Sequence, residues 1–599
     1  MIVFSLVFIK SFSVINRNIQ ILRGVSVLLV ILFHLDIEAF KFGYLGVDIF
    51  FLISGFLMPL ILPKYDAIGF IQARIKRLLP AMAAVVITSL ILGYVLLLPG
   101  EYYNLALSSL SSLIFSSQFY FIFNTGYFAQ ESIYQPLLHT WSLGNEFLAY
   151  ILVFLALLVL PREKIRLFSI VVTIFSLIYL LWSFAFSTIN YLDPISRMFL
   201  FFFSFSISIY RERITCSDKS LLLISIISFL LVCYFYRDDV MQKIWPNYAI
   251  IILPLIIIPL ILMKSDITPF NILNSWFLRL GDWSYSIYIW HWPIIAFERI
   301  YLRNAHIGML ESIALLISSV FVGVISYYSL EKRRTLGKIC SAFSVIIVFA
   351  IVITNGASYR TPESLSNYTS VEAMTDSEYF LSQEAYQDIK VFTISRGVEE
   401  RVTLIVGDSH SRHILPIYKS GDKGTIYRAS IQPDALNERW SSFQSLVKQL
   451  NVNKIIFAYR LHRKNIDDVD SLISNVNELL LSSDYEVDFL RDIPSFDGDP
   501  VACLFSIESD LIFKGCGFDI RLGLPVDKVF NRADPVWNDV VRKASPEINL
   551  IDTHQILCDK GRCLTEINDE FILRDSNHFN EKMSNSTNNQ LYHMFFVPN

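Results

Sequence analysis

A serine, a histidine and a carboxylate that could form a catalytic triad lie in two short runs late in the chain. The first run, Val406–His410, reads V-G-D-S-H and closes an apolar, strand-like segment; the second, Asp575–His578, reads D-S-N-H. We assign Ser409 as the nucleophile, His578 as the general base and Asp575 as the residue that orients this base. A triad is recognised by the roles and geometry of its members and not by their order in the chain. Such a triad would transfer or hydrolyse an acyl group.

The elements that must position these residues fall into two regimes. Residues 1–355 consist largely of apolar runs of about 17–22 residues, the length that a helix needs to cross roughly 30 Å of hydrocarbon. Residues 356–599 alternate short apolar segments with polar turns, and the net charge of −4 gives no hint of nucleic-acid binding. The sequence therefore predicts a polytopic α-helical membrane domain of about eleven spans, followed by an extracytoplasmic α/β domain.

The positions of the spans follow from hydropathy, and their direction follows from lysine and arginine. We expect spans at about 20–38, 45–63, 80–99, 140–160, 165–184, 196–212, 219–236, 246–263, 281–300, 308–328 and 338–354. The positive-inside rule places the basic clusters 74–77, 162–166, 211–219 and 332–338 in the cytoplasm. All four clusters lie on one side only if an even number of spans separates each pair, and this requires that the serine-interrupted apolar segment 103–123 does not cross the membrane. The N-terminus is then inside and the C-terminal domain outside.

Ionisable residues inside the expected spans are the second set of candidates for chemistry. Arg23 and His34 lie in the first span, eleven residues and thus about three helical turns apart, on one face. Glu146 follows His139 by seven residues, or two turns, and again shares a face with it. Because such side chains are costly in hydrocarbon, this arrangement favours a catalytic or conduction core. The structural alternative is a snorkelling arginine and a hydrogen-bonded histidine.

The basic segment 70–80 is expected to be a cytoplasmic loop. Its Arg74 and Arg77 could hold a phosphate-bearing donor, since guanidinium groups match phosphate oxygens bidentately. Alternatively, these residues only mark the cytoplasmic side of the membrane.

The cysteines of the C-terminal region fit an oxidising compartment. Cys503, Cys516, Cys558 and Cys563 form an even set. By proximity alone we favour the pairs 503–516 and 558–563 over free thiols. No C-x-x-C spacing occurs among them, so we expect no metal site.

The C-terminal region is expected to place Ser409 at the edge of a sheet. Strands are predicted at 402–406, 424–428, 454–458, 485–489 and 548–552, with helices such as 437–451 and 466–481 between them. Ser409 then follows the carboxyl end of a strand, where open α/β sheets bind ligands. Its own N–H at a helix start can help to stabilise an oxyanion.

Together, the motifs of the membrane region resemble those of the membrane acyltransferase 3 family. The matching motifs are Arg23-x10-His34, Gly46–Phe51 with Ser54–Phe56, Arg74-x2-Arg77, His139–Leu143 with Glu146, and Tyr285–Tyr288 with His291–Pro293. The two triad runs are similar to the SGNH domain that is fused to a subset of this family. Each motif alone is weak, but five in this order together with the serine module are specific. The resemblance covers about residues 17–599.

The resemblance implies functional roles residue by residue. The residues that match functional positions are Arg23, His34, Glu146, Arg74 and Arg77 in the membrane domain and Ser409, Asp575 and His578 in the SGNH domain. The usual W-S-L-x-x-E-E pattern is incomplete, because Phe147 replaces its second acid. The oxyanion-hole glycine and asparagine of free-standing SGNH hydrolases have no clear match. The segment Ala458–Arg460 stands where that asparagine is expected.

Fused proteins of this kind resemble bacterial O-acetyltransferases of surface glycans that use cytoplasmic acetyl-CoA as donor. We expect a membrane acyltransferase domain at 1–337 with about ten spans, a further transmembrane helix and linker at 338–400, and a periplasmic SGNH-like domain at 401–599. The protein would lie in a bacterial inner membrane. We favour lipopolysaccharide O-antigen as acceptor, with peptidoglycan, capsule and exopolysaccharide as alternatives. From the residues alone, a transporter with an extracytoplasmic binding domain and a membrane-tethered esterase also stay open.

Overall fold

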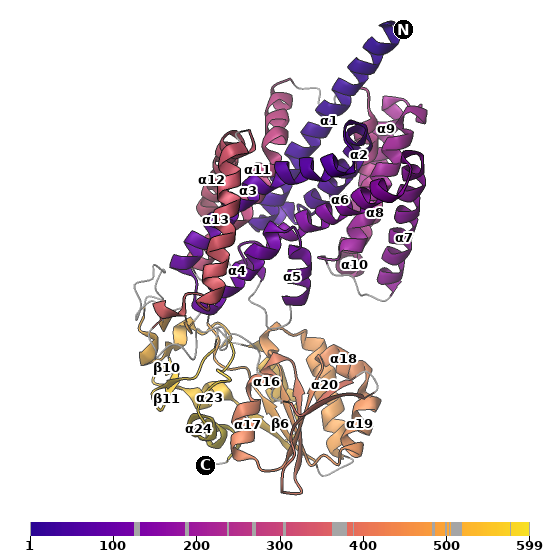
Figure 1. Cartoon of the computed structure of the whole chain (residues 1–599). Coiled ribbons are helices and arrows are strands. Elements are labelled where there is room, and N and C mark those ends of the chain that lie inside the picture. The colour runs from indigo at the N-terminus through magenta and orange to yellow at the C-terminus, as the bar shows by residue number, and fades with distance from the viewer. Residues whose placement is uncertain are drawn as a thin grey trace. The chain divides into compact units, whose positions relative to one another are not determined.

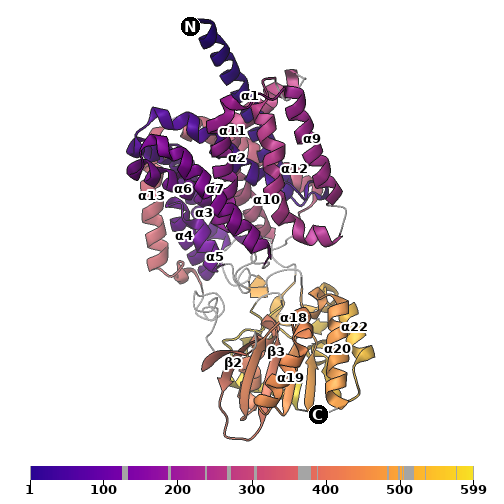
Figure 2. The same ribbon diagram turned by 90° about the vertical axis from the view of Figure 1, so that its right-hand side faces the viewer.

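The chain divides into a helical unit and an α/β unit, in that order (Figure 1, Figure 2). Most of residues 1–354 form the first unit, and residues 355–599 form the second. The computed structural model describes the whole chain except residues 1, 125–131, 186–190, 236–238, 266–270, 303–306, 333, 362–379, 387–388, 482–484, 497–499, 502, 505–517, 533, 575–576 and 598–599.

The helical unit has a long helix at every position where the sequence predicts a span. Its helices are α1 (Ile2–His34), α2 (Leu45–Ile61), α3 (Ala67–Leu96), α4 (Pro99–Leu113), α5 (Ser117–Asn124), α6 (Trp141–Val159), α7 (Ile165–Ala185), α8 (Pro194–Tyr210), α9 (Asp218–Phe235), α10 (Asp239–Leu262), α11 (Asn271–Leu302), α12 (Met309–Ser326) and α13 (Arg334–Ile353). Among the described residues, 6 helical segments are long and apolar enough to be candidate membrane spans. The unit is thus of the membrane-spanning type, and the count of about eleven spans stays a prediction.

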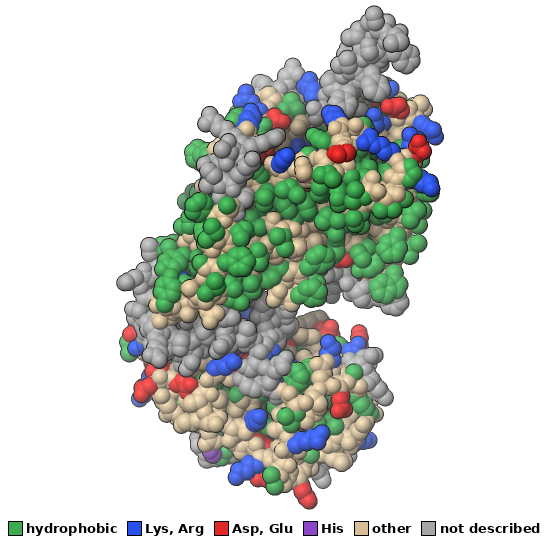
Figure 3. Space-filling model, viewed as in Figure 1, with side chains coloured by type: hydrophobic (Ala, Val, Ile, Leu, Met, Phe, Trp, Pro, Cys, Tyr) green, Lys and Arg blue, Asp and Glu red, His purple; other side chains and the backbone are tan. Residues whose placement is uncertain are grey.

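Apolar side chains cover the flank of the helical unit, as expected of helices that face lipid. On α12, Ile313, Ile317, Phe321 and Ile325 recur every four residues and are exposed, so they form one stripe along the helix. Figure 3 shows hydrophobic side chains across the middle of the unit, with charged side chains gathered toward the end where Figure 1 marks the N-terminus. A concentration of charge at one end is what the positive-inside interpretation requires.

The serine-interrupted segment 103–123 forms two helices instead of one. α4 ends at Leu113, α5 begins at Ser117, and Phe115 between them has a left-handed backbone with φ of 56°. Serine hydroxyls along α4 donate to carbonyls of their own helix. At about 1.5 Å per residue, neither helix is long enough to cross roughly 30 Å of hydrocarbon by itself.

The basic segment 70–80 was predicted to be a loop, and this prediction was wrong. The segment lies inside α3, which begins at Ala67. Asp66 caps this helix, its Oδ1 accepting a hydrogen bond from the Gly69 N–H at 2.8 Å. The helix continues through Pro80. The prediction followed the basic charge of the segment and missed the capping residue Asp66 before it. Arg74 and Arg77 therefore project from a helix and not from a loop.

Two glycines allow α1 and α11 to pack backbone against backbone. A Cβ on Gly24 would lie 2.5 Å from the carbonyl oxygen of Phe277, and one on Gly281 would lie 2.1 Å from that of Gln20. Membrane helices gain their packing energy through such close approaches, because lipid supplies no hydrophobic drive between helices. The close contact aligns the two helices that carry His34 and His291.

The α/β unit is built on a seven-stranded sheet with the strand order β1-β2-β4-β3-β5-β6-β8. These strands are β1 (Ser382–Tyr386), β2 (Ile389–Ser395), β3 (Val402–Gly407), β4 (Thr425–Ser430), β5 (Lys454–Ala458), β6 (Glu486–Leu490) and β8 (Ile548–Ile551). The last five pair in parallel and coincide with the five predicted strands. β1 and β2 pair antiparallel and were not predicted. The α/β unit therefore begins before the expected boundary at residue 401.

Helices cover both faces of the sheet. They are α16 (Ser409–His413), α17 (Leu415–Gly421), α18 (Pro433–Glu438), α19 (Trp440–Gln449), α20 (Ile466–Leu481), α22 (Pro535–Lys543), α23 (Thr553–Leu557) and α24 (Asn585–Phe596). The side chains of successive β3 residues point to opposite faces of the sheet, and a separate hydrophobic core lies on each face. Ile405 packs on the side of α17 and α24, whereas Leu404 and Val406 pack on the side of α18, α19, α20 and α22.

Cysteine-accessibility labelling tests the predicted topology. In a Cys216→Ser background, Glu163→Cys should react only from the cytoplasmic side if the segment 103–123 does not cross, as predicted. The matched variant Lys423→Cys, in the α/β unit, should react only from outside. Labelling of position 163 from outside would mean that 103–123 crosses and that the parity argument fails.

Candidate functional site

Ser409 is positioned by the strand order of the sheet. β3 is the first parallel strand along the chain, and it lies between β4 and β5. The winding of the chain therefore reverses between β3 and β5, and ligands of open α/β sheets bind at such a point, outside the carboxyl ends of the strands. Ser409 begins α16 one residue after β3 ends, as the sequence predicts.

The turn that carries Ser409 needs a glycine and a cap. A Cβ on Gly407 would lie 1.9 Å from the carbonyl oxygen of Ala458 on β5, so only glycine fits where the two strands pass. Asp408 caps α16, its Oδ1 accepting a hydrogen bond from the His410 N–H at 3.0 Å. The tight turn fixes the direction in which Ser409 leaves the sheet.

The other polar atoms of Asp408 anchor the same turn to neighbouring strands. Its Oδ2 accepts a hydrogen bond from the Arg460 N–H at 3.1 Å and forms an ion pair with Lys464 Nζ at 2.8 Å. Its carbonyl oxygen accepts a hydrogen bond from Arg428 Nη2 at 2.9 Å. The side chains of Arg428 and Lys464 and the backbone N–H of Arg460 thus hold the nucleophile turn in place.

The hydroxyl of Ser409 contacts the imidazole of His578. Their Oγ and Nε2 atoms are 2.8 Å apart, within the distance at which a histidine base can take the proton of a serine nucleophile. The structure therefore brings these two predicted residues together across 169 positions of sequence. Asp575, the predicted third member, lies outside the described residues.

The segment that carries His578 is tied to α16 on both sides of the base. The amide Nδ2 of Asn577 lies 3.3 Å from His410 Nε2, and the Phe579 N–H donates to His413 Nδ1 at 2.9 Å. The rings of His410 and His413 also pack against the His578 ring, with centroids 5.0 and 5.3 Å away. The helix that carries the nucleophile therefore also holds the base.

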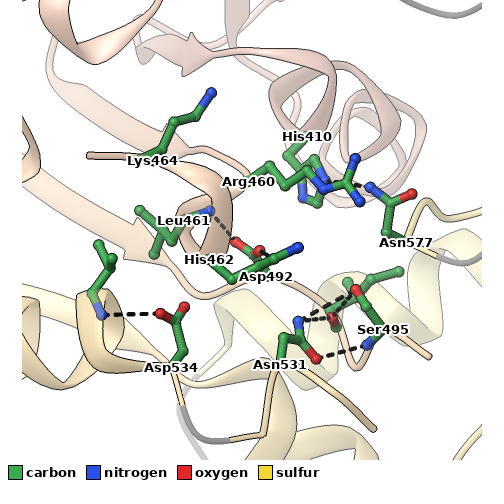
Figure 4. Close-up of polar contacts among 12 residues, drawn as sticks. His410, Arg460, Leu461, His462, Lys464, Asp492, Ser495, Asn531, Asp534 and Asn577 are labelled. Atoms are coloured by element: carbon green, nitrogen blue, oxygen red, sulfur yellow. Dashed lines mark hydrogen bonds and ion pairs between the residues drawn. The ribbon is translucent and has the colours of Figure 1, made fainter. Parts of the chain in front are cut away.

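Arg460 stands where the sequence places the expected oxyanion-hole asparagine. In Figure 4 its side chain extends toward His410 and Asn577. The N–H of Ser409, in the first turn of α16, has no acceptor inside that helix. A backbone donor, a guanidinium and an amide therefore lie beside the nucleophile turn, and donors of these kinds stabilise oxyanions.

A second histidine–carboxylate pair was not predicted. His462 Nδ1 and Asp492 Oδ2 are 2.5 Å apart, and the Leu461 N–H donates to the other oxygen of Asp492 at 2.6 Å (Figure 4). Both residues follow carboxyl ends of parallel strands, and this position in the sequence was the signal that could have found them. The remaining nitrogen of His462, Nε2, is buried without a hydrogen-bond partner in the described part of the chain. It is therefore closed to solvent.

One predicted disulfide is confirmed. Cys558 and Cys563 are bonded and join β9 (Cys558–Asp559) to β10 (Arg562–Cys563). Cys503 is also disulfide-bonded, and Cys516, its predicted partner, lies outside the described residues. Disulfides persist in oxidising compartments, which suits an extracytoplasmic location.

A cavity in the helical unit brings together most of the residues predicted for the membrane site. The cavity lies among α1, α2, α3, α6 and α11. Arg23 from α1, Arg74 and Arg77 from α3, and Glu146 from α6 line it. Aromatic side chains from α2, α6 and α11 form much of the remaining wall.

Arg74 is buried in the wall of this cavity beside two aromatic rings. Its guanidinium carbon lies 5.8 Å from the ring centroids of Phe70 and of Tyr150. Its Nε is buried without a hydrogen-bond partner among the described residues, and the neighbouring Tyr150 hydroxyl donates to Glu146. Three guanidinium groups, those of Arg23, Arg74 and Arg77, line the cavity, so it suits an anionic ligand.

His34 lies apart from this cavity, although it shares a helix with Arg23 and is absent from the cavity lining. Its Nδ1 lies 3.0 Å from His291 Nε2, and its ring packs edge-on against Trp292 with 4.5 Å between centroids. His139 belongs to the same group, with its ring 5.6 Å from that of His291. The predicted membrane residues thus form two groups, an arginine-lined cavity and a histidine cluster.

A serine–histidine pair at the edge of an α/β sheet, joined to membrane helices that enclose an arginine-lined cavity, defines the class of membrane-bound acyl-transferring enzymes. Residues 16–328 match the family described as an acyltransferase domain, and residues 382–591 match the SGNH domain that is fused to AT3 domains. The chain therefore belongs to the membrane acyltransferase 3 family and carries its fused SGNH domain. It is an acyltransferase with a multi-pass membrane unit.

Two similar proteins each match about half of the chain. The chain is 27% identical over 332 residues to a protein of Komagataeibacter xylinus provisionally named membrane-bound transacylase BcsY. This alignment covers 53% of this chain and 82% of BcsY. The chain is also 28% identical over 339 residues to the O-acetyltransferase OatA of Staphylococcus aureus (strain NCTC 8325). This alignment covers 52% of this chain and 55% of OatA. The chain thus matches little more than half the length of OatA. No solved structure matches it.

Acidification should destabilise the α/β unit. Burial, together with the nearby His413 and His578, holds the pKa of His410 well below 6.5. Burial and the charge of Arg491 lower the pKa of His554 from 6.5 to about 4. Both values are lower in the folded than in the unfolded chain, so stability is complete above pH 6.5 and is lost as the pH falls toward 4. For His554 the loss reaches about 3 kcal/mol.

Thermal unfolding of the solubilised full-length protein between about pH 7.5 and pH 5 measures this effect. His554→Gln should flatten the pH dependence of the unfolding midpoint, whereas the exposed control His593→Gln should leave it unchanged. An identical pH dependence in the His554→Gln variant would contradict the assignment.

Proposed function

We propose that this protein is an O-acetyltransferase that moves an acetyl group from cytoplasmic acetyl-CoA across a bacterial inner membrane to a hydroxyl group of a surface glycan. One observation carries the proposal: a single chain combines an arginine-lined cavity among membrane helices with a serine–histidine pair at 2.8 Å. The cavity suits a donor that bears phosphates, and the pair suits acyl transfer to a hydroxyl. The name of the relative OatA supports acetyl as the group transferred.

The donor site is the cavity of the helical unit. Acetyl-CoA carries a diphosphate and a further phosphate, and Arg23, Arg74 and Arg77 offer guanidinium groups that match phosphate oxygens. The charge of the lining supports this assignment, because three arginines face the cavity with Glu146 as the one acid among its described lining residues. Under the positive-inside interpretation, the start of α3 lies on the cytoplasmic side, where the donor is made available.

The reaction exchanges a thioester for an oxygen ester. The carbon–sulfur bond of the donor breaks, a carbon–oxygen bond to the glycan forms, and the hydroxyl proton ends on the thiol. In the membrane, the donor binds at the cavity that Arg23 and Glu146 line, and His34, in the separate histidine cluster, acts on the acetyl group on its way across. On the outer side, His578 takes the Ser409 proton while Oγ attacks the acyl carbon; the bond between that carbon and the group that carried the acetyl breaks, and the proton passes from His578 to the leaving group. The same histidine then activates the glycan hydroxyl that releases the acetyl group from the serine.

The acceptor we favour is lipopolysaccharide O-antigen. The disulfide Cys558–Cys563 supports an oxidising compartment such as the periplasm, and O-antigen is a glycan that passes through it. Mass spectrometry of the cell's glycans with and without this protein distinguishes O-antigen from peptidoglycan, capsule and exopolysaccharide.

Ser409→Ala should reduce acetylation of the glycan by about a thousandfold or more, because the triad nucleophile would be absent. The measurement is incorporation of label from acetyl-CoA into the glycan. The surface variant Ser445→Ala serves as the control, since its hydroxyl only donates within α19. Normal transfer by Ser409→Ala would remove the α/β unit from the chemistry. Release of acetate from the glycan without acetyl-CoA would instead indicate an esterase.

Arg74→Ala and Arg77→Ala should each weaken the use of acetyl-CoA by about tenfold or more, because a charge-assisted hydrogen bond contributes about 1.5–3 kcal/mol. Lysine should substitute poorly at both positions, since it cannot form the bidentate fork. The measurement is the acetyl-CoA concentration dependence of transfer in inside-out vesicles. Lys76→Ala is the matched control, because Lys76 lies on the same helix but does not line the cavity. An unchanged dependence in the double variant would move the donor site elsewhere.

A further inference from the structure

A backbone carbonyl determines which nitrogen of His291 carries a proton. His291 Nδ1 lies 2.5 Å from the carbonyl oxygen of Tyr288, one turn earlier on α11. A carbonyl oxygen only accepts hydrogen bonds, so Nδ1 must carry the proton. The His291 side chain is fully buried, with the rings of His34, His139 and Tyr288 around it. A second proton would bury a charge beside these rings, so the neutral form is favoured and Nε2 keeps a lone pair.

The protonation of His291 determines which nitrogen of His34 carries a proton. His291 Nε2 faces His34 Nδ1 at 3.0 Å. Because Nε2 of His291 is the acceptor, the proton between the two rings belongs to Nδ1 of His34. A neutral imidazole carries one ring proton, so Nε2 of His34 has a lone pair. Among the described residues, nothing hydrogen-bonds to this nitrogen.

We infer that His291 is a positioning residue for acyl transfer: it fixes His34 in the Nδ1–H tautomer and leaves the Nε2 lone pair of His34 available. The inference rests on the proposed function, in which His34 acts on the acetyl group. As a base, Nε2 takes the proton that a hydroxyl loses when its oxygen bonds to the acyl carbon, while the carbon–sulfur bond of the donor breaks and the sulfur leaves as thiolate. As a nucleophile, Nε2 bonds to the acyl carbon while the carbon–sulfur bond breaks and sulfur leaves as thiolate. Both roles need the lone pair.

α11 also holds the backbone of His34. Arg299 Nη2 donates to the carbonyl oxygen of His34 and to Asp36, both at 2.9 Å. This contact satisfies an acceptor at the end of α1 that no helical N–H can reach. Arg299 lies two turns beyond His291 on α11, so one face of that helix orients both the ring and the backbone of His34.

The third histidine of the cluster has the opposite tautomer and cannot replace His34. His139 Nε2 lies 3.1 Å from the carbonyl oxygen of Ile289, so Nε2 carries its proton. Its lone-pair nitrogen, Nδ1, is buried without a partner among the described residues. His139 and His291 are both buried, whereas His34 is partly exposed. Of the three rings, only that of His34 can meet a substrate.

A pair of substitutions separates this role from simple packing. His291→Gln keeps an acceptor oxygen that can face His34 Nδ1, whereas His291→Leu removes the acceptor and keeps an apolar side chain of similar reach. In vesicles with the full-length protein, His291→Leu should lower kcat by about tenfold or more, and His291→Gln should stay within about threefold of wild type. The KM for acetyl-CoA should stay within about twofold in both, because the arginine-lined cavity is unchanged.

The tautomer itself can be measured on the wild-type protein. Nitrogen NMR of the histidine-labelled full chain in lipid, with the His34 signals assigned through His34→Gln, should show a protonated Nδ1 and an unprotonated Nε2. A protonated Nε2 in wild-type His34 would overturn the inference without reference to any variant at position 291. Equal loss of transfer in the His291→Gln and His291→Leu variants, at equal amounts in the membrane, would overturn it as well.

The outcomes distinguish this inference from the function on which it rests. If wild-type protein transfers no acetyl group from acetyl-CoA to glycan, the proposed function is wrong. If wild type transfers acetyl but His34→Ala does so equally well, the membrane role of His34 falls, and the inference falls with it. If His34→Ala is inactive and His291→Leu is fully active, the proposed function stands and only the role of His291 is overturned.

Discussion

The helical unit depends on one constraint: polar side chains among membrane helices must find their partners inside the protein. Asp48 and Arg197 illustrate it, because both are buried and their Oδ1 and Nε atoms approach to 3.4 Å. Arg299 does the same for the end of α1. Some buried donors keep no hydrogen-bond partner among the described residues, and they include the Nε atoms of Arg74, Arg197 and Arg299. Arg74 lies in the wall of the cavity that Arg23, Arg77 and Glu146 also line, and the three guanidinium groups there suit an anion.

In both units a backbone group determines the state of a histidine. In the helical unit, the Tyr288 carbonyl fixes the proton of His291, which in turn faces His34. In the α/β unit, the Phe579 N–H occupies Nδ1 of His413 and so anchors the chain next to the base. Backbone groups are well suited to this task, because packed helices and paired strands fix their direction before any ligand arrives. The membrane unit and the SGNH domain thus prepare their histidines in the same physical way.

Much of the site was predictable because its signals are local. The five parallel strands were found from apolar runs, and the position of Ser409 followed from the turn after β3. The disulfide between Cys558 and Cys563 followed from proximity in the chain. The local signals that failed are also informative: the Asp66 cap was overlooked, so the segment 70–80, in the first half of α3, was predicted to be a basic loop. The polar edge strand β1 has little hydrophobic alternation, which explains why the sheet was expected to begin later.

The sequence by itself determined the two regimes of the chain, the long membrane helices, the parallel strands and the residue types that can perform acyl chemistry. Only the tertiary structure decided which of these residues meet. It separated His34 from the cavity of Arg23, although both lie on one helix, and paired it with His291 across 257 positions. It also brought His462 and Asp492 together at the carboxyl edge of the sheet. The physical reason is that periodicity along a chain reports one element at a time, whereas partners depend on helix approach, here through Gly24 and Gly281, and on strand order.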